Sequence, residues 1–229
     1  MKKVENEFEV IQDIADFKDK IVIDVGCGPG DLVRKLSASG AQAIGIDNLE
    51  MLKKAKECPP IGHEKYIQGE GQNIPIENNY ADFVIFFASL HHVPVDRMEQ
   101  ALKETHRILE NNGSAIIVEP VGKKGSFYEI VRLVGDERKV QKEALKAINN
   151  ARSFGLENIK EKEAIIYIER SYADYVKLLE IFLPDEKKRN EILLQAKEIT
   201  TRLSRAAGIS LENFRYKSIC RLNILRKSP

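Results

Sequence analysis

The stretch Ile21–Asp31, with the sequence IVIDVGCGPGD, decides the fold. Its first five residues form a short β-branched apolar run, which is typical of a buried strand. Glycines then occupy alternate positions from Gly26 to Gly30, and glycine permits a tight turn in which backbone N–H groups face a ligand with no Cβ in the way. Helical spacing begins at Asp31 and stops at Gly40. The stretch therefore predicts a strand, a glycine-rich turn and a helix.

The same alternation continues along the chain. Further strand-like runs occupy residues 41–47, 65–69, 81–89, 114–120, 163–170 and 214–225, and helical patterns occupy residues 49–57, 96–110, 137–152, 172–182 and 186–207. Strands that alternate with helices over short connections predict right-handed parallel crossovers with helices on both faces. We expect a single α/β domain over residues 1–229. Its doubly wound, mostly parallel sheet would have seven strands, with the last strand antiparallel and a helical insertion between strands six and seven.

Composition excludes several classes of protein. A chain of 229 residues, 43% hydrophobic and 31% charged, suits one globular domain. A net charge of +1 provides no overall attraction to nucleic acid or to an anionic membrane. The first ten residues, MKKVENEFEV, carry acids where a signal peptide would need an apolar stretch, and no apolar run approaches the roughly twenty residues of a membrane span. The three cysteines are widely spaced, which suggests neither a disulfide framework nor a metal site and favours a reducing cytoplasm.

The glycine turn does not match a dinucleotide-binding motif. The G-x-G-x-x-G pattern, counted from Gly26, places Asp31 at its sixth position, and an acid at a helix N-terminus repels a pyrophosphate. Asp24, Asp47 and Glu70 lie at expected strand ends, with no Lys or Arg in the same turns. The pocket is therefore expected to be negative and to bind a positively charged nucleoside without phosphate.

Asp47 has two interpretations. It follows Gly26 by 21 residues, at the end of the second strand, where nucleoside-binding sheets place a carboxylate that accepts hydrogen bonds from both ribose hydroxyls. It also directly precedes the helical pattern at residues 49–57, where a carboxylate can act as the helix N-cap. The glycine turn favours the ribose interpretation.

The motifs resemble those of the class I S-adenosylmethionine-dependent methyltransferases. VIDVGCGPGDL (residues 22–32) is similar to the first motif of that family almost position for position. QGEGQNIPIENNYADFVIF (68–86) resembles the stretch that leads from strand three into strand four. LHHV (90–93) and LKETHRILENNGSAIIVEP (102–120) resemble the small-molecule branch, which includes quinone-biosynthesis enzymes. The resemblance covers roughly the first half of the chain and says little about the methyl acceptor.

The resemblance assigns cofactor roles residue by residue. It implies that Gly26, Gly28 and Gly30 frame the methionine half of the cofactor, that Asp24 lies near its amino group and that Asp47 binds the ribose hydroxyls. Glu70, where the family usually has Asp, would contact the adenine amino group, with Gly71 and Gln72 beside the ring. The Phe87 carbonyl would face the methionine ammonium, and Asn48 would replace the apolar residue that commonly covers adenine. Cys27, inside the turn, is expected to pack beside the cofactor and to have no covalent role.

Candidate catalytic residues lie at the rim where an acceptor would enter. Methyl transfer needs a general base only if the acceptor is protonated at ambient pH. His91 and His92 follow strand four, and Glu119 ends strand five at the same rim. Each also has a purely structural interpretation: a histidine can bond backbone near the Pro94 turn, and Glu119 can make a local backbone contact. The charged stretch at residues 137–146 is expected to be a solvated helix face.

Specificity should come from outside the motifs. Residues 1–18 are expected to contribute a lid helix, and residues 171–208 are expected to cap the site or to pack against the sheet or a dimer partner. The resulting hypothesis is methyl transfer from S-adenosylmethionine to a small molecule, with S-adenosylhomocysteine as product, by a monomer or a homodimer. The alternatives are a non-catalytic S-adenosylmethionine-binding module and an aminopropyl transferase. The latter should have carboxylates after strand four, where this chain has Phe86, Phe87 and His91.

Overall fold

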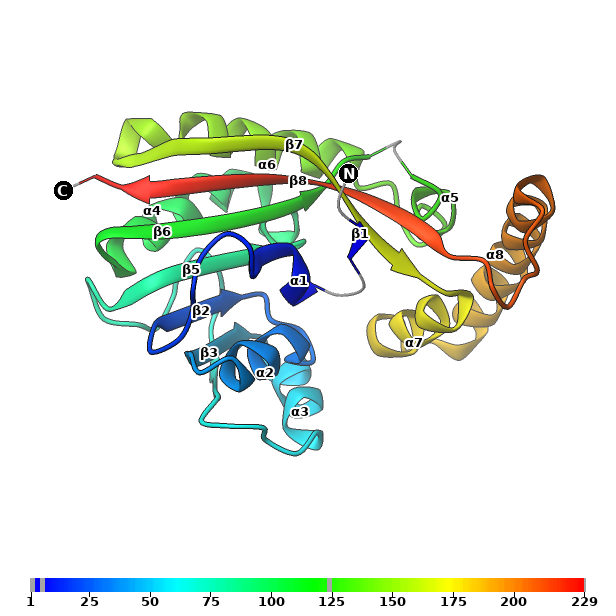
Figure 1. The fold of residues 1–229 in the computed structure, drawn as a ribbon, viewed down its shortest axis with the longest axis horizontal. Helices are drawn as coiled ribbons and strands as arrows, with labels where there is room; N and C mark the ends of the chain where they lie inside the picture. The colour runs from blue at the N-terminus through cyan, green and yellow to red at the C-terminus, as the bar shows by residue number, and fades with distance from the viewer. Residues whose placement is uncertain (1–2, 5–6, 123–124, 229) are drawn as a thin grey trace.

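The computed structural model, which describes residues 3–4, 7–122 and 125–228, contains one mixed sheet with the strand order β1-β7-β8-β6-β5-β2-β3-β4 (Figure 1). The strands are β1 (Lys3–Val4), β2 (Ile21–Val25), β3 (Gln42–Asp47), β4 (Lys65–Gln68), β5 (Ala81–Phe87), β6 (Leu109–Pro120), β7 (Leu156–Arg170) and β8 (Tyr216–Lys227). The helices are α1 (Glu7–Ile11), α2 (Asp31–Ala38), α3 (Leu49–Glu57), α4 (Met98–Ile108), α5 (Tyr128–Val131), α6 (Arg138–Asn150), α7 (Tyr172–Phe182) and α8 (Glu186–Ala207).

The expected sheet is confirmed. The strands from β2 to β6 pair in parallel, and β8, the last strand, pairs antiparallel with both β6 and β7. Some details differ from the sequence-based expectation, among them the start of β6 at Leu109 instead of residue 114. An eighth strand, β1, pairs in parallel with β7, and β7 begins at Leu156 instead of residue 163. The added part of β7, LENIKEK, carries no apolar run, because one side of a strand near a sheet edge can remain in water.

Both faces of the sheet are covered, as the doubly wound arrangement requires. In β5, Val84 and Phe86 belong to the buried cluster that includes residues of α4 and α6. Ile85 and Phe87 belong to the cluster on the other face, which includes residues of α1, α2 and α3. This alternation explains why β5 is apolar on both faces.

The helical insertion between β7 and β8 has the expected bounds. A capping box between Ser171 and Asp174 begins α7, and Asp185 caps α8, which ends at Gly208 in the left-handed conformation. The insertion forms a third buried cluster with α5 and the start of β8, centred on Tyr175 and Tyr216. Figure 1 shows it beyond the end of the sheet toward which β5 and β6 point.

The N-terminal helix is shorter than expected. Within residues 1–18, α1 covers only Glu7–Ile11, and residues 1–2 and 5–6 lie outside the described part of the chain. The Lys18 N–H donates to Asp16 Oδ1 at 3.0 Å, a local bond that competes with helical pairing. Val10 and Ile11 are buried in the cluster that covers one face of the sheet, so α1 is held against β2 and α2.

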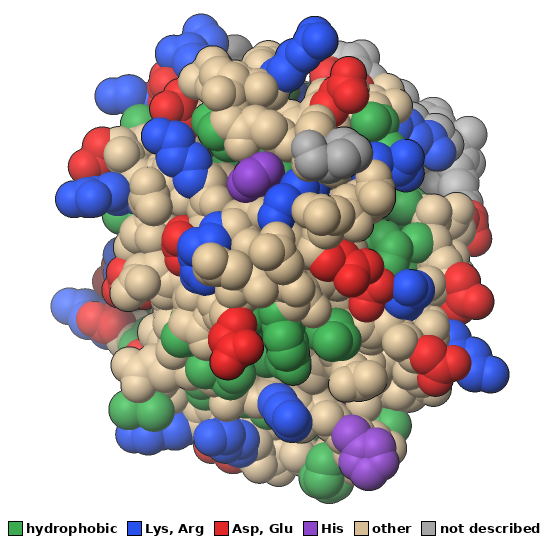
Figure 2. Space-filling view, turned by 90° about the vertical axis from the view of Figure 1, so that its left-hand side faces the viewer, with side chains coloured by type: hydrophobic (Ala, Val, Ile, Leu, Met, Phe, Trp, Pro, Cys, Tyr) green, Lys and Arg blue, Asp and Glu red, His purple; other side chains and the backbone are tan. Residues whose placement is uncertain are grey.

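The surface carries mixed charge. Figure 2 shows the end of the molecule opposite the insertion, where basic and acidic side chains are interspersed. A bilayer-crossing helix is absent from the described part of the chain, whose longest helix, α8, is rich in charged residues.

Candidate functional site

The glycine turn between β2 and α2 has the backbone that its sequence predicts. Gly26, Gly28 and Gly30 have φ values of 74°, 53° and 80°, in the left-handed region that other residues rarely adopt. A Cβ at Gly26 would lie 2.6 Å from the Cβ of Ser89, the residue that follows β5 by two positions. Glycine is therefore required here both by the dihedral angle and by the close approach of two chain segments.

Asp47 holds this turn in place. At the end of β3, its Oδ2 accepts a hydrogen bond from the Gly28 N–H at 2.7 Å, and its Oδ1 accepts from the Asn48 N–H at 2.7 Å. The helix N-cap of α3 is Asn48 instead, whose Oδ1 accepts from the N–H groups of Glu50 at 3.0 Å and Met51 at 3.1 Å. The cap interpretation of Asp47 is therefore wrong. Asn48, which we expected to lie over adenine, is the residue that caps α3.

Asp24 is a buried carboxyl whose hydrogen bonding is incomplete. Its side chain is 3% exposed, and its Oδ1 has no hydrogen-bond partner among the described residues. Burial raises the pKa of Asp24 well above its ordinary value, and the negative charges of Glu7 and Asp47 raise the pKa further. The structure thus brings together acids from β2, β3 and α1 beside the glycine turn.

Glu7 was missed by the sequence analysis. Burial raises its pKa, and the positive charge of Arg170, at the end of β7, partly offsets this effect. The Arg170 guanidinium lies 3.8 Å from Glu7 and comes from the end of β7, outside the turns that carry Asp24, Asp47 and Glu70. Arg170 also donates to Ser218 Oγ at 3.0 Å and lies over the ring of Phe127. It is therefore tied to the neighbouring strand β8.

The turn after β4 lies beside Asp47, because the Gly69 N–H donates to the Asp47 backbone carbonyl at 3.1 Å. Within this turn the Gln72 amide donates to the carboxylate of Glu70, which is exposed, whereas Gly71 is buried. The backbone bond between Gly69 and Asp47 thus brings the turn that carries the predicted adenine-side residues to the end of β3.

Two apolar candidates pack beneath the turn. Phe87, at the end of β5, and Cys27 are buried in the same cluster. Burial, reinforced by Asp24 and Asp47, raises the pKa of the Cys27 thiol. A thiol that stays protonated is a poor nucleophile, which favours the packing interpretation of Cys27.

His91 and Glu119 form a buried pair. The short 3₁₀-helix η1 (Leu90–His92) follows β5, and His91 Nδ1 is hydrogen-bonded to Glu119 Oε2. Glu119, which is fully buried in β6, also accepts from the Leu90 N–H at 3.0 Å. Burial alone would lower the pKa of His91, but the hydrogen bonds with Glu119 and Glu137 outweigh it and raise the pKa to about 9. An imidazole that is protonated at neutral pH cannot accept a proton, which argues against His91 as a general base in this state.

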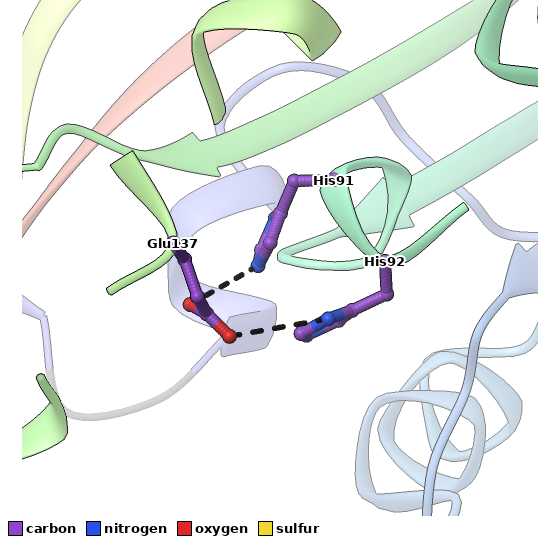
Figure 3. Close-up of side chains that lie close together, drawn as sticks. All are labelled: His91, His92 and Glu137. Atoms are coloured by element: carbon purple, nitrogen blue, oxygen red, sulfur yellow. Dashed lines mark ion pairs between the residues drawn. The ribbon is translucent and has the colours of Figure 1, made fainter. Parts of the chain in front are cut away.

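Glu137 is a second residue that the sequence analysis missed. It stands directly before α6 and turns toward η1, so its Oε2 lies 3.5 Å from His91 Nε2 and its Oε1 lies 4.0 Å from Nδ1 of the exposed His92 (Figure 3). The hydrogen bond with His91 lowers the pKa of Glu137. The expectation of a solvated face at residues 137–146 is therefore wrong for Glu137, although Lys139, Lys142 and Lys146 are exposed as expected. One glutamate at the start of a charged helix carries no sequence signal for this contact.

Part of the chain is similar in sequence to known methyltransferases. Residues 23–117 match the family model described as a methyltransferase domain. The demethylmenaquinone methyltransferase of Staphylococcus aureus is 34% identical over 115 residues, which are 48% of this chain and 47% of that protein. The chain spans about half the length of the curated relatives it matches.

Solved structures resemble nearly the whole chain. The YcgJ protein of Bacillus subtilis has a TM-score of 0.65 at 17% identity and covers 97% of this chain and 98% of its own. The [4+2]-cyclase SpnF has a TM-score of 0.64 at 14% identity and covers 96% of this chain and 80% of its own. At these identities the likeness establishes the fold alone. Residues 23–117 are thus similar to a methyltransferase domain, and nearly the whole chain shares the α/β fold of these solved structures.

Proposed function

We propose that the protein binds S-adenosylmethionine at the glycine turn and transfers its methyl group to a small-molecule acceptor. The observation that carries this proposal is the buried Asp24 carboxyl without a partner on Oδ1, beside a turn that has no phosphate-binding pattern. A buried carboxylate requires a cation or hydrogen-bond donors. S-adenosylmethionine provides an ammonium and a sulfonium group and contains no phosphate.

The residues divide the task between them. Asp24, with Glu7 nearby, would hold the ammonium group, and Asp47 would bind the ribose while keeping Gly28 in position. The turn at residues 70–72 would line the adenine side. When bound, the cofactor supplies an electrophilic methyl group for in-line attack by the acceptor. The buried pair of His91 and Glu119 would orient the acceptor and exclude water at the opposite side of the methyl group.

The insertion at residues 171–208 is proposed to cap this site. Phe182, at the end of α7, comes within 3.8 Å of the position that a Cβ on Gly28 would occupy, although its side chain is 56% exposed. Lys54 of α3 donates to the Ile181 carbonyl, which links α7 to the cofactor-binding half of the sheet. We also propose that α1, which carries Glu7, closes the side of the pocket over β2.

The acceptor is proposed to be a small, partly apolar molecule. The S. aureus relative is named for a demethylated menaquinone, so an isoprenoid hydroquinone is the first acceptor class to test. The fold by itself does not decide the reaction, because one structural neighbour is named as a cyclase.

Calorimetric titration with S-adenosylmethionine, and with NAD⁺ as the dinucleotide control, tests the proposal. We expect one S-adenosylmethionine site per chain, no NAD⁺ binding and release of S-adenosylhomocysteine with a hydroquinone panel. Amide exchange followed in the same titration should slow in α1 and α7. NAD⁺ binding in place of S-adenosylmethionine would overturn the proposal, and binding without release over a broad metabolite pool would favour the non-catalytic module.

Asp24→Asn should raise the free energy of unfolding and lower the affinity for S-adenosylmethionine. The raised pKa of Asp24 means that the folded state holds its proton to a higher pH than the unfolded state. The wild type therefore loses stability as the pH rises above about 4, whereas Asn removes this loss. The unfolding free energy of the variant should exceed that of the wild type by an amount that grows as the pH rises above about 4, measured by urea denaturation. Its affinity for S-adenosylmethionine should fall by roughly 10- to 100-fold, because a charged hydrogen-bond acceptor is lost.

Asp96→Asn, at an exposed carboxylate on the 3₁₀-helix η2 (Val95–Arg97), is the matched control and should change neither quantity. An Asp24→Asn variant that is less stable than the wild type at pH 8, or that binds S-adenosylmethionine equally well, would remove Asp24 from the proposed site.

A further inference from the structure

Three metal-ligating side chains meet at the acceptor end of the sheet. His91 and His92 come from η1 and Glu137 comes from the start of α6, and one potential ligand atom from each lies within 4.8 Å of the others (Figure 3). Protein ligands lie at about 2.0–2.2 Å from a tetrahedral zinc ion, and therefore at about 3.3–3.6 Å from one another. The distance of 3.5 Å between His91 Nε2 and Glu137 Oε2 already matches this spacing.

A buried carboxylate fixes the orientation of His91. Glu119 pairs with His91 Nδ1 through Oε2, while its Oε1 is held by the Leu90 N–H at 3.0 Å. The ring therefore directs Nε2 toward Glu137, and an ion bound there would displace the proton that Nε2 carries in its absence. Histidines that bind metals almost always donate their other ring N–H to a carboxylate or carbonyl, which fixes the tautomer and raises the basicity of the ligand nitrogen. Glu119 is thus placed as the outer partner of a ligand and not as a ligand itself.

We infer that His91, His92 and Glu137 bind a divalent transition-metal ion, Zn²⁺ by the nature of the donors. Two imidazole nitrogens and one carboxylate oxygen are the donor set of zinc sites that keep one position open. The side chain of His91 is 2% exposed, whereas those of His92 and Glu137 are 61% and 36% exposed. The cluster is therefore anchored in the core on one side and open to solvent on the other, which gives the ion a route of entry and leaves room for a further oxygen ligand. From the spacing of the cysteines alone we expected no metal site.

The cluster adjoins the proposed cofactor site. Ser89 precedes His91 by two residues. Its Cβ lies 2.6 Å from the position that a Cβ on Gly26 would occupy, and its Oγ donates to the Val25 carbonyl at 2.6 Å. An ion at this place would position a hydroxyl or phenol acceptor near the glycine turn. This second role rests on the proposed function, whereas binding of the ion does not.

The test uses the full chain after treatment with a chelator. Calorimetry with Zn²⁺ and visible absorption with Co²⁺ should each give one equivalent per chain. His92→Ala and Glu137→Gln should each weaken Zn²⁺ binding at least about tenfold and change the Co²⁺ spectrum. Both side chains are partly exposed, so these variants should keep the circular dichroism of the wild type. His63→Ala removes an exposed histidine outside the cluster and should behave as the wild type does.

Failure of the wild type to bind one equivalent of either ion, or unchanged binding in both variants, would show that the three residues form an ion pair only. S-adenosylmethionine affinity measured on the same samples separates the two proposals. Zn²⁺ binding without cofactor binding would leave the metal site standing and overturn the proposed function. Cofactor binding without Zn²⁺ binding would overturn the metal site and leave the proposed function standing.

Discussion

Asp47→Ala is expected to weaken S-adenosylmethionine binding by about 100- to 1000-fold while the chain stays folded. The variant would lose the two charge-assisted hydrogen bonds that Asp47 makes to the ribose in the proposed complex, together about 3–4 kcal/mol of binding free energy. The variant also releases the Gly28 N–H, which Asp47 Oδ2 binds at 2.7 Å, so the turn loses its preferred shape before the ligand arrives. Calorimetric titration measures the affinity, and thermal unfolding confirms the fold.

Asp47→Asn is the matched control for this result. Its amide oxygen can still accept from Gly28, but it offers only one acceptor atom and no charge, so its affinity should fall between those of the wild type and of Asp47→Ala. Equal affinity in all three proteins would refute the ribose assignment. A loss in Asp47→Asn as large as in Asp47→Ala would assign the effect to the ribose and not to the turn.

His91→Ala is expected to lower the free energy of unfolding by about 3–5 kcal/mol, because it leaves the fully buried Glu119 without its charged partner. From the sequence alone we would expect this variant to lose turnover only. The structure instead predicts a large stability defect, so turnover by this variant is informative only where the folded fraction is known. Urea denaturation of the wild type and the variant measures the difference.

Two further variants test whether the stability loss in His91→Ala comes from the broken pair with Glu119. The double variant His91→Ala/Glu119→Gln replaces the orphaned carboxylate by a neutral amide and should recover part of the lost stability. His92→Ala, at the exposed neighbour, should stay within about 0.5 kcal/mol of the wild type. A His91→Ala variant within 1 kcal/mol of the wild type would show that the buried pair contributes little to folding.

The pair Asp47–Asn48 shows why the sequence left some assignments open. Both residues have short polar side chains next to the start of α3, and either type makes a good helix N-cap. Sequence spacing cannot choose between them, because the choice depends on where the glycine turn of another strand lies. Because β2 and β3 pair in parallel, the Gly28 N–H donates a hydrogen bond to the Asp47 carboxylate, and Asn48 acts as the N-cap of α3.

The extents of α1 and β7 show a related limit. α1 ends at Ile11 although apolar residues continue at helical spacing, and in the segment that follows the Asp16 side chain accepts from the Lys18 N–H, a bond typical of turns. β7 begins at Leu156 in a charged segment, since its hydrogen bonds to β8 do not require apolar side chains. Apolar periodicity detects buried faces and says little about backbone pairing in contact with water.

The local pattern of this chain determined the order of strands and helices, the glycine turn and most of the residues around it. These features depend on short-range properties: β-branched runs, helical spacing, stop signals and glycines that adopt positive φ. Only the tertiary structure decided that Glu7 of α1 lies near Asp24 and that Glu137, directly before α6, meets the two histidines. Such polar contacts join elements far apart in the sequence, and the packing of those elements, which no local period encodes, determines which side chains meet.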